Sequence, residues 1–564
     1  MKFKDYEYVR PDYDNVKEKY LSLINDFSNS KTADEQYSFL QKINALSREV
    51  ETMAQLVYIR NSINTADEFY DEEKSYMDMT SPHFHGLRVE FYKQLLNSKF
   101  KEELKDRIHP QLITLTEMEI KTFSDEVIPL MQEENKLISE YDKLISSAKI
   151  EYDGKTLNLS QLQPYMESKD RHIRKEAHEK WSSFFEENEN EFDLIYDKLV
   201  KVRNQIALKL GFKNFIDLGY LRMGRSDYNS KDVQNFREHV LNYLVPISNE
   251  LRQRQAKRIG VDEFKYYDIP LNFMSGNPAP KGNKEWIMER TKKMYEELSP
   301  ETHEFINMMI DKDLFDMETK PNKQAGGYCT YLYDYKSPFI FANFNGTQDD
   351  VTVVTHEAGH AFQTYQSRNF DAPEYSFPTS EAAEIHSMSM EFITWPWMET
   401  FFEKDIEKFK FFHLADSLCF IPYGVTVDEF QHIVYESPNM TPDERKKAWR
   451  DIEKKYTPYK DYDDNDFLDS GTYWFKQGHI FASPFYYIDY TLAQICSYQF
   501  WLRFNEDREK AWEDYLKICK IGGSQSFLQI LKAGNLESPF EEVAINRVAS
   551  RIKEYLDTID DMKL

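Results

Sequence analysis

The chain has 564 residues, which is too long for one ordinary core and predicts two or three domains or one large helical assembly. Hydrophobic residues make up 41% and aromatic residues 15%, with only 18 Gly and 21 Pro, so the composition excludes a collagen-like or generally disordered chain. The 71 Lys and Arg residues against 97 Asp and Glu residues give a net charge of −26, which leaves no overall electrostatic reason to bind nucleic acid or an anionic membrane.

The cellular compartment is indicated by features near the N-terminus and by the cysteines. The first eight residues contain no apolar segment of a secretory signal. The most apolar stretch, 411–425, is interrupted by His, Asp and Pro, so we expect no membrane span. We therefore expect a cytoplasmic protein. No Cys-x-x-Cys pair occurs, so we interpret all four cysteines as reduced core thiols: Cys329, Cys419, Cys496 and Cys519.

The first 260 residues predict successive amphipathic helices, because apolar residues recur there at spacings of three and four. Pro and Gly then cluster in 268–283, which is typical of a loop or a domain connection. We expect a helical N-terminal region over 1–267, a connection over 268–283 and a second region over 284–564. Helix should resume near Lys284 and continue toward Met309.

After this helix the sequence pattern changes from helical to strand-like. Segments 326–332 and 339–344 are short, aromatic and bounded by Gly, Pro or Asn, which predicts the only clear pair of strands in the chain. Thr347 and Asp350 have the spacing of a capping box and predict a helix that extends to about Arg368.

A further helix should begin at Ser380 and end before Pro396. The rest reads as mostly helical, apart from a long ordered loop over 456–485 that is rich in Gly, Asp and aromatic residues.

The sharpest signal is the sequence His356-Glu357-Ala358-Gly359-His360. Residues four apart share one face of a helix, so the two imidazoles can reach one metal ion together. Glu357 lies near enough to take a proton from water at that ion. The pattern therefore predicts a metal-dependent hydrolase.

A catalytic zinc needs a third protein ligand and one open position. Position 366 is Gln, so the third histidine of the longer metzincin pattern is absent and a carboxylate is expected instead. Glu381 and Glu384 are both candidates; Glu381 sits in a first helical turn, where the helix dipole explains an acid, so we prefer Glu384. Glu391, two turns further, either hydrogen-bonds a ligand imidazole or is an ordinary solvated residue. His386 faces away and is read as structural.

These motifs resemble the thimet oligopeptidase and oligoendopeptidase F family of zinc peptidases, which includes the Pz-peptidases. Three segments carry the resemblance: 356–360, 384–391 and the His- and Tyr-rich 479–490. It is strong over about 320–499, whereas the N-terminal half is compatible but carries no specific motif.

The resemblance implies a mainly α fold in which two helical halves flank a deep substrate channel, with a small β-sheet beside the zinc-binding helix. Residues 1–267 would form one channel wall and 284–564 the catalytic region. It also implies one Zn²⁺ per chain and internal cleavage of short unfolded peptides. The oligomeric state is not indicated.

The resemblance further implies roles for individual residues. His356, His360 and Glu384 would bind the zinc, and Glu357 would act as general base. Tyr490 would stabilise the oxyanion, with His479 and Tyr486 beside the substrate; Tyr487 is an alternative for either tyrosine.

The substrate backbone is expected against an edge strand formed by 339–344. Gly326 and Gly327 either allow its close approach or are ordinary turn residues.

Other functions remain open from the sequence. A zinc carboxypeptidase on the same site would need a cationic group for the substrate's C-terminus. A helical di-iron protein would use Glu357-x-x-His360 and Glu429-x-x-His432 with Glu384 and Glu391, but it gives His356 no role. A non-catalytic helical scaffold predicts no stoichiometric metal.

Overall fold

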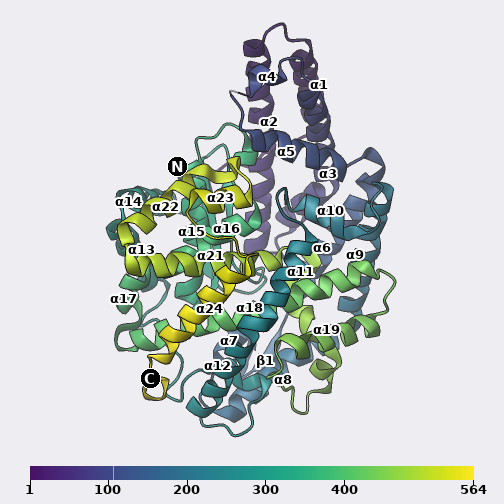
Figure 1. The fold of residues 1–564 in the computed structure, drawn as a ribbon. Helices are drawn as coiled ribbons and strands as arrows, with labels where there is room; N and C mark the ends of the chain where they lie inside the picture. Colours follow the sequence, from purple (N-terminus) through teal and green to yellow (C-terminus); the bar gives the residue numbers. More distant parts are fainter. Residues whose placement is uncertain (106) are drawn as a thin grey trace.

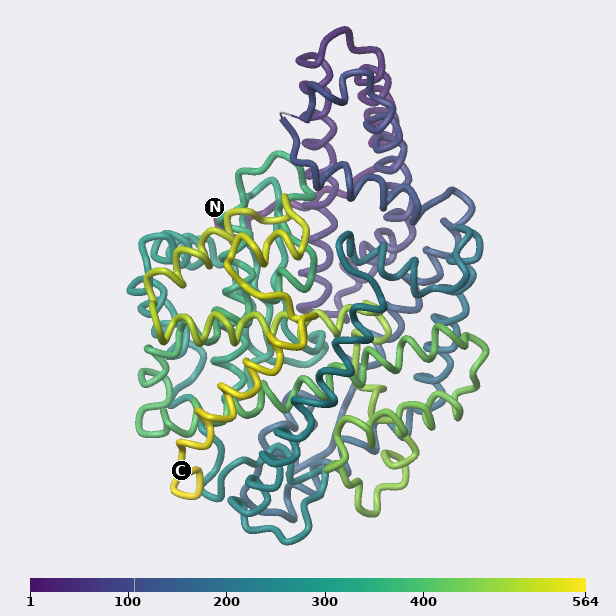
Figure 2. Tube along the Cα trace, in the orientation of Figure 1, coloured from purple at the N-terminus to yellow at the C-terminus, as the bar shows by residue number. Residues whose placement is uncertain are grey.

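The computed structural model describes residues 1–105 and 107–564, and helices dominate it (Figure 1). The trace in Figure 2 shows a broad body from which the N-terminal helices α1 and α2 project at one end. The mainly helical fold predicted from the sequence is therefore confirmed. The helices before residue 268 are α1 (Tyr13–Asn29), α2 (Ala33–Ile63), α3 (Glu68–Leu96), α4 (Lys101–Leu104), α5 (Pro110–Glu119), α6 (Ile128–Ser146), α7 (Leu159–Met166), α8 (Arg171–Glu187), α9 (Glu189–Lys209), α10 (Phe215–Arg222), α11 (Ser230–His239) and α12 (Val245–Arg258).

The second half is also helical, and its helices surround the candidate site. The predicted helix after 284 is two helices, because Ser299 caps a new one that has Pro300 as its first residue. The α-helices of this half are α13 (Lys284–Leu298), α14 (Pro300–Asp311), α15 (Asp349–Ser367), α16 (Ser380–Ile393), α17 (Glu399–Phe402), α18 (Ile406–Glu436), α19 (Pro442–Tyr456), α20 (Gly478–Ala482), α21 (Tyr487–Glu506), α22 (Arg508–Ile521), α23 (Phe527–Ala533) and α24 (Glu542–Asp557).

The buried hydrophobic residues that are described form one main core and three smaller clusters. A small core joins α1, α2 and α3 in the projecting part, around Phe27, Leu40 and Phe91. The main core is one cluster in space. Its members lie between Tyr6 and Leu556 in the sequence and come from both sides of 268–283. The division of the chain at 268–283 remains a prediction.

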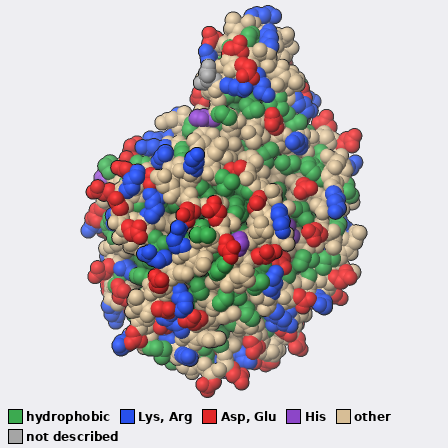
Figure 3. Space-filling model, viewed as in Figure 1, with side chains coloured by type: hydrophobic (Ala, Val, Ile, Leu, Met, Phe, Trp, Pro, Cys, Tyr) green, Lys and Arg blue, Asp and Glu red, His purple; other side chains and the backbone are tan. Residues whose placement is uncertain are grey.

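The surface is charged, and most of the cysteines lie in the interior. Acidic and basic side chains are interspersed over the face shown in Figure 3. All four cysteines are free, and three of them are buried. Within the described part of the chain, no helix combines the length and the apolar character that crossing a membrane requires.

The small sheet differs from the predicted strand pair. Strands β4 (Tyr328–Leu332) and β5 (Ser337–Phe344) pair antiparallel, as predicted. However, β3 (Phe315–Glu318) pairs parallel with the other side of β5, so the order is β3-β5-β4. The prediction that 339–344 forms the edge is therefore wrong; the edges are β3 and β4, and the residue just before β4, Gly327, lies beside Glu357. The four-residue β3 was missed because Phe-Asp-Met-Glu is too short and too polar to stand out.

Two further local features were not predicted. A hairpin of β1 (Ile150–Tyr152) and β2 (Lys155–Leu157) interrupts the N-terminal helices, with Asp153 and Gly154 in the left-handed conformation at its turn. The capping box expected at Thr347 and Asp350 is also wrong. Instead, the Asp350 carboxylate accepts hydrogen bonds from the backbone amides of Asn345 and Gly346, which fixes the connection between β5 and α15.

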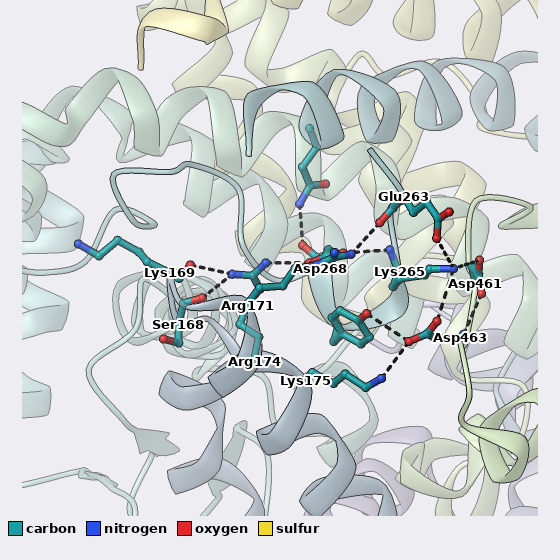
Figure 4. A network of polar contacts seen from close by, with 12 residues as sticks. Ser168, Lys169, Arg171, Arg174, Lys175, Glu263, Lys265, Asp268, Asp461 and Asp463 are labelled. Atoms are coloured by element: carbon teal, nitrogen blue, oxygen red, sulfur yellow. Dashed lines mark hydrogen bonds and ion pairs between the residues drawn. The ribbon is translucent and has the colours of Figure 1, made fainter. Parts of the chain in front are cut away.

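A buried ion-pair network ties α8 to the segment that leads into the second half (Figure 4). The Asp268 side chain is fully buried and accepts hydrogen bonds from Arg171 at 2.7 and 3.0 Å and from Arg174 at 2.7 Å. Arg174 is itself buried, and Arg171 is partly exposed. Burial opposes ionisation of Asp268, but the two guanidinium groups outweigh it and lower the pKa of this carboxyl below 3.8.

The same network reaches the segment before the His- and Tyr-rich turn. Lys175 of α8 contacts Asp463 at 3.0 Å, and Lys265 contacts Asp461 at 2.9 Å. Three segments far apart in sequence therefore meet at one set of charges (Figure 4).

We predict that Asp268→Asn lowers the free energy of unfolding by about 3 kcal/mol, because it leaves the buried guanidinium group of Arg174 without its counter-charge. Asp463→Asn, at a more exposed position, should cost about 1 kcal/mol or less. Denaturant titrations would measure both. Because the folded-state pKa of Asp268 is lowered, its contribution is fully present above about pH 4 and is lost as the pH falls below that value and through the folded-state pKa. Equal losses in the two variants would contradict this account.

Candidate active site

Helices α15 and α16 pack unusually closely at Gly359. A Cβ atom at this position would lie 2.6 Å from both the carbonyl oxygen of His386 and the Cα of Ser387, so no larger residue fits. Gly359 precedes the second histidine of the motif, and the contact brings the two helix backbones together at that point. Both helices have the bounds predicted from the sequence to within two residues.

This contact brings the two histidines of the motif close to Glu384, the preferred third ligand. The Nε2 atom of His356 lies 3.2 Å from Oε2 of Glu384, and the Nε2 atom of His360 lies 3.3 Å from the same oxygen. One ligand atom from each residue falls within 4.8 Å of the others, and Glu384 is buried. Burial opposes its ionisation, but His360 and His356 outweigh it and hold the pKa of the Glu384 carboxyl well below its usual value. Two imidazole nitrogens and one carboxylate are the donor set of a catalytic zinc site, so these residues fit the metal.

A chain of hydrogen bonds behind His356 fixes the orientation of its ring. His356 Nδ1 lies 2.7 Å from Oε1 of Glu391, so the carboxylate binds the Nδ1 proton and Nε2 is the ring nitrogen that faces Glu384. Glu391 Oε2 lies 2.7 Å from Nε2 of His413, and the indole nitrogen of Trp395 donates to Nδ1 of His413 at 2.9 Å. Of the two readings of Glu391, the structure supports the one in which it bonds a ligand imidazole. His413 and Trp395 were missed, because nothing in their spacing connects them with the motif.

Glu357 is buried beside this group and lines the same cavity. Its Oε1 atom would lie 3.3 Å from a Cβ at Gly327, so the glycine backbone runs close to the carboxylate. Burial raises the pKa of the Glu357 carboxyl, while His356 and His360 oppose that rise. A carboxylate with a raised pKa is better matched to accepting a proton near neutral pH.

The remaining candidate residues lie elsewhere. Glu381 is fully buried and does not line the cavity; burial raises its pKa to about 7, and the positive charge of Arg225 partly offsets that rise. Glu429 contacts Lys455 on the exposed side of α18, and His432 contacts Asp428. Within the described residues the metal-binding group includes none of these three, so the geometry gives no di-iron arrangement. His386 is buried and lies outside the cavity.

The His- and Tyr-rich segment lies across the cavity from the motif. Gln477 donates its side-chain amide to Nδ1 of His479 at 2.9 Å, which leaves the proton of this imidazole on Nε2. That nitrogen lies 3.1 Å from the Tyr490 hydroxyl. Burial lowers the pKa of His479 to about 4, so the ring is neutral at pH 7. Since the Tyr490 oxygen accepts from His479, its own proton is available to another acceptor. The sequence did not indicate Gln477.

Tyr486 and Tyr487 have different surroundings. The Tyr486 hydroxyl donates to Oε1 of Glu384 at 2.5 Å, so this side chain also contacts the metal-binding group. Burial and the Glu384 charge raise the pKa of Tyr486 well above its usual value and keep it protonated. Tyr487 is buried and points into a neighbouring pocket, away from Glu384.

His356, Glu357, His360, Glu384, His479, Tyr486 and Tyr490 all line one cavity of about 590 Å³. Its walls come from both halves of the chain, since Tyr58 and Tyr141 of the N-terminal region face the motif helix and the His- and Tyr-rich segment. A second pocket of about 350 Å³ adjoins it, and His479 and Tyr490 line both. Such a volume suits a few amino acid residues of an extended peptide. The predicted arrangement of two helical halves around a channel is confirmed.

Family models match most of the chain. A model described as the peptidase M3 N-terminal domain matches residues 3–123, and one described as peptidase family M3 matches residues 164–549. The chain belongs to peptidase family M3, as the sequence motifs suggested, and it is a metallo-oligopeptidase.

Individual relatives and structures agree with the family assignment. An oligoendopeptidase F homologue of Borreliella burgdorferi is 24% identical over 70% of this chain and 69% of its own. Oligopeptidase PepF of Bacillus subtilis is 21% identical over 80% of this chain and 71% of its own. A structure of PZ peptidase A with an inhibitor is 52% identical, with a TM-score of 0.99 and full coverage of both chains. A protein described as an oligoendopeptidase F from Bacillus anthracis strain Ames is also 52% identical, with a TM-score of 0.94 over 100% of this chain and 99% of its own.

We predict that Gly359→Ala separates α15 from α16, because the added methyl group collides with the α16 backbone. The free energy of unfolding should fall by about 2 kcal/mol, and metal affinity should fall at least about tenfold. Calorimetry and competition with a chelator would measure the two effects. Ala361→Gly is the matched control, since it perturbs the same helix without adding atoms at the contact. If the control lost as much metal affinity, close helix packing would not be the cause.

Proposed function

We propose that the protein is a zinc-dependent oligoendopeptidase that hydrolyses internal bonds of short unfolded peptides. The observation that carries this proposal is the convergence of His356, His360 and Glu384 beside the buried Glu357 in one cavity. The relatives named as oligoendopeptidases support it. The N-terminal region 1–267 would form one wall of the substrate channel.

His356, His360 and Glu384 would hold one Zn²⁺ per chain. When bound, zinc supplies Lewis-acid chemistry, which acidifies water and polarises a carbonyl group. Glu391 keeps His356 in the tautomer that can bind a metal. Tyr486 donates a hydrogen bond to Oε1 of Glu384, whereas the two histidines lie closest to Oε2. These two contacts orient the ligands before any metal arrives.

Glu357 is the proposed general base. Its carboxylate takes a proton from the water that attacks the scissile carbonyl, and then passes this proton to the leaving amine. The buried position of Glu357 favours this shuttle because its raised pKa brings the carboxylate closer to the basicity of the groups with which it exchanges the proton.

Tyr490 and His479 are the proposed oxyanion stabilisers. Negative charge develops on the carbonyl oxygen during attack, and a preorganised O–H donor lowers the energy of that state. The neutral His479 donates to the Tyr490 oxygen and thereby strengthens the tyrosine as a donor.

The substrate backbone is proposed to extend along β4, an edge strand, near Gly327. An extended peptide can add to a strand edge through backbone hydrogen bonds without regard to side-chain identity. A glycine at this point permits the approach of a second backbone, and folded proteins would not fit within the cavity.

We predict that Glu357→Gln lowers kcat by about a thousandfold while zinc content stays stoichiometric, since only the proton acceptor is lost. An internally quenched peptide of about ten residues would report the rate, and mass spectrometry would identify the products. Internal cleavage by the wild type is expected. Stepwise release from the C-terminus would assign the site to a carboxypeptidase instead, and an unchanged rate in the variant would reject Glu357 as the base.

We also predict that Tyr490→Phe lowers kcat by about a hundredfold with little change in KM, because the hydroxyl acts mainly in the transition state. Tyr487→Phe serves as the matched control, as its ring points into the adjoining pocket. A larger loss in Tyr487→Phe than in Tyr490→Phe would exchange the two assignments.

A further inference from the structure

The turn that carries the tyrosines into the site contains a strained residue. Phe485 joins α20 to α21 and has a backbone φ of +67°, in the left-handed region. A bulky residue in this conformation is strained and persists only where its surroundings enforce it. Tyr486 follows directly, so the backbone direction at Phe485 determines where Tyr486 and the start of α21 point.

Both peptide groups of Phe485 are held by buried side chains. Its amide donates to Oε1 of Gln431 at 2.9 Å, and its carbonyl accepts from the guanidinium of Arg225. Gln431 lies on α18 and is itself anchored, because its amide nitrogen donates to the Val427 carbonyl at 3.2 Å. The free oxygen of Gln431 is therefore fixed in the position that meets Phe485.

The Phe485 ring is confined as well. A Cβ at Gly219 of α10 would lie 2.6 Å from a ring atom of Phe485, so the ring packs directly on the α10 backbone. The His432 and Tyr435 rings lie with centroids 4.9 and 5.6 Å away. The ring is thus confined by α10 and α18, which carry none of the proposed zinc ligands.

Arg225 also reaches the first turn of α21. It donates to Oδ1 of Asp489 at 2.7 Å, and both side chains are fully buried. Asp489 directly precedes Tyr490, while the other contact of Arg225 directly precedes Tyr486. One guanidinium group therefore binds the backbone carbonyl that precedes Tyr486 and the carboxylate that precedes Tyr490.

The geometry points to Arg225 and Gln431 as positioning residues of the reaction: by holding Phe485 in the left-handed conformation, they direct the Tyr486 and Tyr490 hydroxyls toward the zinc-binding side chains. This inference rests on the proposed function, because it assigns to the two residues an effect that passes through those hydroxyls. Neither residue lines the cavity, so neither contacts the substrate.

The test is a double-mutant cycle with Gln431→Met, which keeps the side-chain volume but removes the acceptor for the Phe485 amide. In the wild-type background kcat should fall about tenfold to a hundredfold, with KM and zinc content within twofold, because the hydroxyls are misplaced while the zinc ligands are untouched. In a Tyr486→Phe/Tyr490→Phe background the same replacement should change kcat less than about twofold.

Gln255→Met is the matched control. Gln255 is a buried glutamine on α12 that donates to the Ile269 and Leu271 carbonyls, away from the cavity. It should lower thermal stability while leaving kcat within twofold of the wild type. Arg225→Lys is a second variant that keeps the charge but loses the guanidinium fork, and it should reproduce the kcat loss of Gln431→Met.

The outcomes separate this inference from the proposed function. An equal kcat loss from Gln431→Met in both backgrounds, or an unchanged kcat in the wild-type background, would overturn the positioning role. If the two tyrosine replacements themselves left kcat unchanged, the proposed oxyanion stabilisers would be rejected first.

Discussion

The candidate site depends on the absence of a side chain at Gly359. With nothing larger than hydrogen there, α15 and α16 approach until backbone meets backbone, and the histidines of one helix face the carboxylate of the other. Electrostatics then favours the arrangement, because the imidazoles hold Glu384 ionised despite its burial.

On the opposite wall of the cavity, Tyr486 and Tyr490 are positioned in a different way. Here the chain makes a strained turn at Phe485, and the buried Arg225 binds the backbone and the carboxylate that flank the tyrosines. Arg203 of α9 likewise donates to the Phe481 carbonyl. Arginines of the N-terminal half therefore anchor the His- and Tyr-rich segment, so this half contributes to the site without supplying any proposed zinc ligand.

Burial gives the groups of the cavity distinct proton states. It keeps Tyr486 and Tyr490 protonated and His479 neutral, so all three are hydrogen-bond donors at pH 7. It also makes the nearby Glu357 a stronger base than a solvated glutamate. Acceptors and donors thus lie on opposite walls, as hydrolysis of a peptide bond between them requires.

The sequence alone determined what depends on local spacing. Helical periodicity predicted the fold class, the i, i+4 spacing placed both motif histidines on one helix face, and Ser380 and Pro396 bracketed the helix that carries Glu384 and Glu391. The family resemblance added the His- and Tyr-rich segment. Only the tertiary structure decided that β5 is the central strand and β4 an edge, that Glu391 connects His356 to His413 and Trp395, and that Arg225 and Gln431 hold Phe485. The hydrogen bonds among them join residues 18 to 260 positions apart, and no periodic pattern encodes which distant side chains will meet once the helices pack.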